Sequence, residues 1–127
     1  MAKIRPFKAI RPTRDKVHLV ATRPYYTYKD IVLKAKLEDN PYTFLHIINP
    51  EFGEKHKTET NSNERFASVS DAYHEFIDNG ILKQDKNEHI YLYRQTTEEN
   101  EYMGIVAGAN VQEYKEDKIK KHEATLT

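Results

Sequence analysis

The chain has 127 residues and no net formal charge, with a hydrophobic fraction of 38% and a charged fraction of 31%. This composition suits one domain with a small core and a well-solvated surface. The absence of cysteine excludes a disulfide framework, a thiolate nucleophile and a cysteine-ligated zinc site. Neither a membrane-spanning run nor a signal peptide is visible, so we expect a single cytoplasmic domain over residues 1–127, with no membrane contact. The lack of net positive charge argues against nucleic-acid binding.

Hydrophobic periodicity and turn residues predict short helices and strands along the whole chain. In chain order they predict extended pieces near 7–10 and 17–21, a helix over 28–38, a buried strand over 43–48, a helix over 64–79, strands near 81–84, 89–96 and 102–110, and a short helix over 112–118. Asn63 is the expected N-cap of the longest helix, and Gly80 is its expected left-handed C-terminal residue. These elements predict an α+β fold with a single sheet, mixed or mainly antiparallel, and two main helices.

Two polar residues stand in or after the run 43–48, which is rich in aromatic and β-branched residues. His46 inside an apolar strand fits a hydrogen-bonded core histidine. If the end of that strand opens on a cleft, His46 becomes a candidate substrate-binding residue and Glu51 a candidate acid or base. Both interpretations stay open on the sequence alone.

Two further residues lie in irregular backbone near three prolines. Arg11 could bind a carboxylate or phosphate through its planar guanidinium, with Tyr25 beside it as a second substrate-binding candidate. The alternative is a surface arginine with a tyrosine packed on the first helix. His74 and Asp78 share a helix face, but the second histidine of a zinc-protease motif is missing, so we predict no metal site.

Near the end of the chain, His122 beside Glu123 offers a proton-transfer pair, with a solvated polar run as the alternative. No glycine-rich phosphate-binding loop is visible. The last residues, 119–127, carry no terminating glycine, proline or capping residue. We therefore expect this chain to be the amino-terminal part of a longer protein.

Several segments in this order are similar to a bacterial and archaeal family, domain of unknown function 1015. The segments are 3–12, 24–25, 40–51, 80–82, 91–95, 104–108 and 119–123. The resemblance covers essentially the whole chain. It departs from the family pattern at Tyr26, where the family usually has Asp after the proline-tyrosine step.

The resemblance implies a function for the longer protein. Members of the family are about three times as long, and their downstream part resembles the phosphate-handling loop of the ParB and sulfiredoxin superfamily. This implies a kinase-like protein that transfers a phosphoryl group from a nucleotide, with Mg²⁺, to a small hydroxyl substrate. The chain would then line part of the pocket. His122, Glu123 and Glu51 are its catalytic candidates, and Arg11, Tyr25 and His46 its substrate-binding candidates.

A non-catalytic binding or dimerisation module is the alternative function. Gly104 and Gly108 on one face of a strand, together with the tyrosines, suit an interface of a homodimer. A winged-helix DNA-binding module is less favoured, because the helix over 64–79 carries four carboxylates against one arginine.

Overall fold

The computed structural model describes residues 1–121. They form two compact units. The helical unit comprises Ile10–Lys83, and the hairpin unit comprises Met1–Ala9 together with the chain from Gln84 onward. The two units are distinguished because each is compact by itself. That residues 1–127 form a single domain stays a prediction.

Helices and antiparallel strand pairs both occur in residues 1–121, which confirms the α+β prediction. In place of the single sheet that the sequence predicts, the strands of this part of the chain form three two-stranded sheets. They pair as β1 (Ile4–Arg5) with β6 (Gly108–Ala109), β2 (Ile10–Pro12) with β3 (Leu82–Gln84), and β4 (Tyr91–Thr96) with β5 (Glu101–Val106).

Two segments of the helical unit that the sequence predicts as extended are helical. The run predicted as a strand over 43–48 contains α3 (Leu45–Ile48), and the piece near 17–21 contains α1 (Val17–Val20). Leu45 and Ile47 are buried, and α3 contacts the longest helix. Tertiary packing has therefore overridden the strand propensity of the β-branched residues.

The longest helix, α4 (Asn63–Asp78), matches the prediction closely. The Ser62 hydroxyl, rather than the predicted Asn63, caps it by accepting the Arg65 main-chain N–H at 3.1 Å. At the other end Gly80 has a φ of 71°, as predicted for a left-handed residue. The next residue, Ile81, then folds back into the core.

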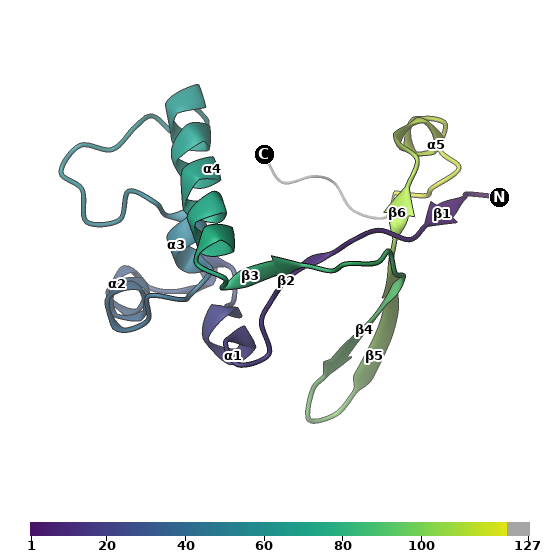
Figure 1. Ribbon diagram of the computed structural model, residues 1–127, viewed down its shortest axis with the longest axis horizontal. Coiled ribbons are helices and arrows are strands. Elements are labelled where there is room, and N and C mark those ends of the chain that lie inside the picture. Colours follow the sequence, from purple (N-terminus) through teal and green to yellow (C-terminus); the bar gives the residue numbers. More distant parts are fainter. Residues whose placement is uncertain (122–127) are drawn as a thin grey trace. The chain divides into compact units, whose positions relative to one another are not determined.

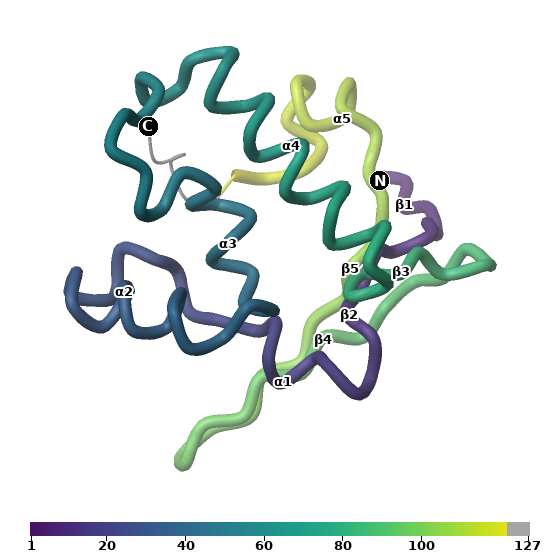
Figure 2. Tube along the Cα trace, turned by 60° about the vertical axis from the view of Figure 1, so that its left-hand side comes forward, coloured from purple at the N-terminus to yellow at the C-terminus, as the bar shows by residue number. Residues whose placement is uncertain are grey.

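The core of the helical unit lies where α3, α4 and β3 meet. Its buried members are Val20, Ile47, Phe76, Ile81 and Leu82. The other main helix, α2 (Asp30–Asp39), is close to the predicted 28–38, and it follows a short 3-10 helix, η1 (Tyr25–Thr27). α3 lies between α2 and α4 (Figure 1 and Figure 2). Within α2, Leu37 is the buried residue.

The hairpin unit is built around β4 and β5, whose register pairs Leu92 with Ile105 and Tyr93 with Gly104. At its base the Phe7 and Tyr91 rings pack with centroids 5.2 Å apart. The Tyr91 hydroxyl accepts the Ala9 main-chain N–H at 3.0 Å. The last helix of the described residues, α5 (Val111–Lys115), is capped by the Asn110 side chain, which accepts the Gln112 main-chain N–H at 2.8 Å. Within this unit, β1 therefore pairs with β6, and the segment that follows β1 contacts the base of the hairpin through the half-buried Tyr91.

Candidate functional site

A hollow of the helical unit lies along α1 and α2, and we call it the α1–α2 cleft. It has a volume of about 610 Å³. Its apolar wall consists of Leu19, Ile31, Val32 and Ala35, and its polar groups come from His18, Thr22, Tyr28, Lys36, Asp39, Asn40 and Thr43. Ligand sites of proteins are commonly concave, about 300–1,000 Å³, and mostly apolar with a few converging polar groups. The α1–α2 cleft fits that description in volume, and its lining combines apolar and polar side chains.

The apolar wall of the cleft is the outer face of α2. Ile31 is 78% exposed and Val32 is 41% exposed, whereas Leu37 on the other side of the helix is buried. α2 therefore has apolar side chains on two faces: the face with Leu37 is buried, and the face with Ile31 and Val32 is exposed. The helical spacing of Ile31, Val32 and Ala35 is visible in the sequence, but it does not reveal that this face is exposed while Leu37 is buried.

Tyr28 is the polar residue of the cleft with the most perturbed chemistry. Its phenol oxygen accepts the Arg23 main-chain N–H at 3.2 Å and lies 3.3 Å from the Thr22 hydroxyl. The hydrogen bond with Thr22, followed by the Arg23 N–H and the nearby Lys36 ammonium, lowers the pKa of Tyr28 below the ordinary tyrosine value. The Lys36 Nζ lies 5.1 Å from the centre of the Tyr28 ring. The cleft therefore combines a polarised phenol with a cation.

Asn40 lines the cleft and connects the elements around it. Its side-chain amide donates to the Leu19 carbonyl at 2.7 Å, and its side-chain oxygen accepts the Tyr42 N–H at 2.9 Å. Its own carbonyl lies 2.9 Å from the His46 Nε2, which donates to it. Because these bonds connect α1, the end of α2 and α3, the cleft is shaped before any ligand arrives.

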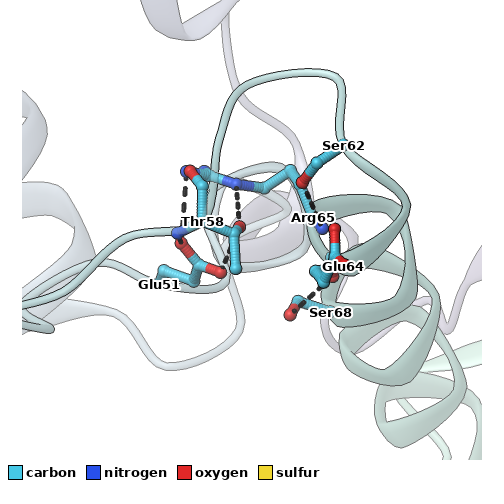
Figure 3. A network of polar contacts seen from close by, with 6 residues as sticks. All are labelled: Glu51, Thr58, Ser62, Glu64, Arg65 and Ser68. Atoms are coloured by element: carbon cyan, nitrogen blue, oxygen red, sulfur yellow. Dashed lines mark hydrogen bonds and ion pairs between the residues drawn. The ribbon is translucent and has the colours of Figure 1, made fainter.

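Glu51 lies in a separate polar network (Figure 3). Its carboxylate is buried and accepts the Thr58 N–H at 2.8 Å and the Thr58 hydroxyl at 2.6 Å. Arg65 makes an ion pair with it at 3.1 Å and donates to the Thr58 carbonyl at 2.8 Å. The Thr58 hydroxyl, then the Thr58 N–H and the charges of Arg65 and Lys57, lower the pKa of Glu51. This carboxylate therefore stays ionised at neutral pH and fixes the loop between α3 and α4.

The structure distributes the predicted site residues over several places. His46 lines a hollow of about 380 Å³ beside α4, and Glu51 lines another of about 370 Å³. Arg11 lies in β2, and Tyr25 lies in η1 with its ring 5.7 Å from that of Tyr26. None of these four residues lines the α1–α2 cleft.

The remaining two candidates, His122 and Glu123, lie outside the described residues. The catalytic and substrate-binding roles of all six residues stay predictions. Within residues 1–121 the structure contains no group of three or more histidine or acidic side chains placed to hold a metal ion. Nor does any helix in that part of the chain have the length and apolar character needed to cross a bilayer.

Comparison with known proteins gives one result. Residues 4–127 match the sequence model of the family described as Protein of unknown function (DUF1015). The chain belongs to this family. The match covers essentially the whole chain. It confirms the family resemblance that the order of the sequence segments predicted. No curated protein and no solved structure matches the chain. The relation of the DUF1015 family to the ParB and sulfiredoxin superfamily stays a prediction.

Proposed function

We propose that this member of the DUF1015 family is a small-molecule-binding module and that the α1–α2 cleft is its binding site. The observation that carries the proposal is a hollow of about 610 Å³ with an exposed apolar wall and a ring of polar groups. An apolar helix face that no other element covers is costly in water, and a ligand that covers it is stabilised by the burial. The hydrogen bonds of Asn40 support the proposal further, because a preformed site loses little entropy on binding.

The charges of the cleft favour a zwitterionic ligand. Lys36 and Asp39 are three residues apart on α2, so their side chains lie on one face of the helix, and both line the cleft. An amino acid can place its carboxylate near Lys36 and its ammonium near Asp39. Its side chain then lies against Ile31 and Val32. We therefore propose free amino acids with apolar or hydroxyl-bearing side chains as the ligand class.

The test is a thermal-shift titration of the chain with the twenty amino acids, each compared with its N-acetyl derivative, which lacks the ammonium group. A ligand that binds the folded state raises the melting temperature. Ala35→Trp fills the cleft and abolishes the shift. Ala67→Trp is the matched control, because Ala67 is exposed on α4 and does not line the cleft. If no amino acid raises the melting temperature, or if Ala35→Trp binds as well as Ala67→Trp, the proposal is wrong.

The resemblance of the sequence to the family supports a second, more specific proposal for the longer protein that it implies: nucleotide-dependent phosphorylation of a small hydroxyl compound. Its support is the sequence resemblance alone, and the described chain adds a restriction. The Glu51 carboxylate is engaged with Thr58 and Arg65, whereas the His46 Nε2 donates to the Asn40 carbonyl and leaves Nδ1 as the basic nitrogen of that ring. The full-length protein with Mg²⁺ and ATP, assayed over amino acids and sugars, tests this. An absence of nucleotide consumption across the panel refutes the kinase activity while leaving the binding test intact.

A further inference from the structure

The β4–β5 hairpin exposes apolar side chains on both of its faces. Each of its strands is hydrogen-bonded along its length to one other strand of the described chain, namely its partner in the hairpin. One face carries Leu92, Met103 and Ile105, which are 76%, 61% and 65% exposed; the other carries Tyr93, Tyr102 and Val106. A two-stranded ribbon of this kind is only marginally stable in water. The hairpin therefore has surface that a further strand would stabilise.

The outer edge of β5 lacks the features that normally protect an exposed strand. Proteins block such edges with proline, lysine or a bulge. Residues 101–106 contain no proline and no lysine, and they pair with β4 in continuous register without a bulge. At their centre Gly104 has no atom within 4 Å of the position that a Cβ would occupy. The face of the sheet at the centre of this strand is therefore open.

We propose that this edge pairs with the β5 strand of a second copy of the chain, in an antiparallel dimer with its two-fold axis at Gly104. In an antiparallel pair, two residues that face each other lie on the same face of the sheet. For two identical strands this requires the two-fold axis to pass through a residue position rather than between two residues. With the axis at Gly104, Met103 pairs with Ile105 of the second copy, and Tyr102 pairs with Val106. Aromatic and β-branched side chains stabilise one another in such cross-strand pairs. The interface is then apolar on both faces.

Other registers and edges match less well. An axis at Met103 would set Glu101 against Ile105 of the second copy. If β4 paired with itself, an axis at Arg94 would place two arginines together, and an axis at Tyr93 would place Leu92 against Arg94. Like charges directly opposite each other destabilise a sheet. Pairing through β5 at Gly104 avoids all of these mismatches.

Charge complementarity also favours a second copy. The turn of the hairpin carries Glu98, Glu99 and Glu101 and no basic residue between positions 96 and 102. In the Gly104 register, Glu99 of one copy reaches the level of Ala109 of the other. There Lys3 and Arg5 line a hollow beside β6, which they share with Glu113. In this register the glutamates of one turn therefore lie near the level of Lys3 and Arg5 of the second copy, and the two-fold axis repeats this arrangement.

Cysteine crosslinking tests the register, because the native chain contains no cysteine. Cysteines at two facing strand positions are about 4.5–5.5 Å apart between Cα atoms, which suits a disulfide. Gly104→Cys should therefore form a covalent dimer under mild oxidation. Tyr93→Cys is the matched control: Tyr93 pairs with Gly104 within the hairpin and is similarly placed on the surface. In the proposed dimer the two residues at position 93 lie three strand spacings apart, about 14 Å, which is too far for a disulfide.

Sedimentation of the unmodified chain over a range of concentrations tests the dimer itself. We expect a dimer whose proportion rises with protein concentration. Met103→Lys should convert it to a monomer. Leu92→Lys, on the same face of the hairpin but away from the β5 edge, should leave it dimeric. Circular dichroism confirms that both variants are folded. A monomer at every concentration overturns the proposal. So does equal crosslinking of Gly104→Cys and Tyr93→Cys, or an equal effect of the two lysine variants.

Discussion

Gly80 ends α4 in a conformation that other residues adopt only at a cost. Its φ is 71°. Its N–H donates to the Ile77 carbonyl at 3.0 Å, and the Ile81 N–H donates to the Phe76 carbonyl at 2.9 Å. These two bonds form a Schellman motif and direct Ile81, which is buried, into the core. Since the motif and the burial of Ile81 fix the backbone, Gly80→Ala must keep the left-handed conformation.

The magnitude of this substitution follows from the backbone alone. Nothing lies within 4 Å of the position of the new Cβ, so no steric clash adds to the cost. A left-handed conformation costs an L-residue roughly 1–2 kcal/mol, and the lower entropy of the unfolded alanine chain offsets about 0.4–1 kcal/mol. We expect a net loss of about 1 kcal/mol, which lowers the melting temperature of a unit of this size by about 4–8 °C.

Thermal and urea unfolding, followed by the helical circular dichroism signal, measure this loss. Gly104→Ala is the matched control, because Gly104 does not have a left-handed φ and also has open space around it. At low protein concentration that variant should leave the helical unit unchanged. If Gly80→Ala is as stable as the native chain, or if the two alanine variants lower the midpoint equally, then the left-handed backbone is not what makes Gly80 necessary.

Three further predictions concern side chains of the helical unit. Ser62→Ala removes the cap of α4 and should cost about 1 kcal/mol in urea unfolding, whereas Ser70→Ala, on the exposed middle of the helix, should cost much less. The folded-state pKa of Glu51 is lowered, so its stabilising contribution is present above the unfolded-state pKa of about 4.3 and is lost as pH falls through the folded value. Stability measured against pH should therefore decline in acid less steeply for Glu51→Gln than for the native chain, and parallel curves would contradict the network in Figure 3. Because the hydrogen bond with Thr22 contributes most to the lowered pKa of Tyr28, tyrosinate absorbance should show the earliest ionisation shifted to higher pH in Thr22→Ala and absent in Tyr28→Phe. An unchanged titration in Thr22→Ala would refute that cause.

The sequence and the structure agree best where a pattern is local and strong. The helix over 64–79 combines a long apolar stripe with a terminal glycine, and both determine backbone conformation within a few residues. The strands near 89–96 and 102–110 alternate around a short turn, and they form the β4–β5 hairpin, while the end of the second run is β6, which pairs with β1. The N-cap differed by one residue, because Ser62 and Asn63 are adjacent and both can cap a helix.

The sequence by itself determined the α+β class, the family, the longest helix and the hairpin, since each depends on periodicity, on turn residues or on the order of segments. Tertiary structure alone decided that the run 43–48 contains helix α3, because burial of Leu45 and Ile47 outweighs the strand propensity of its β-branched residues. It also decided that Glu51 meets Thr58 and Arg65, and that Tyr28, Lys36 and Asn40 surround one cleft. Such contacts depend on where the chain folds back on itself, which no local sequence pattern encodes.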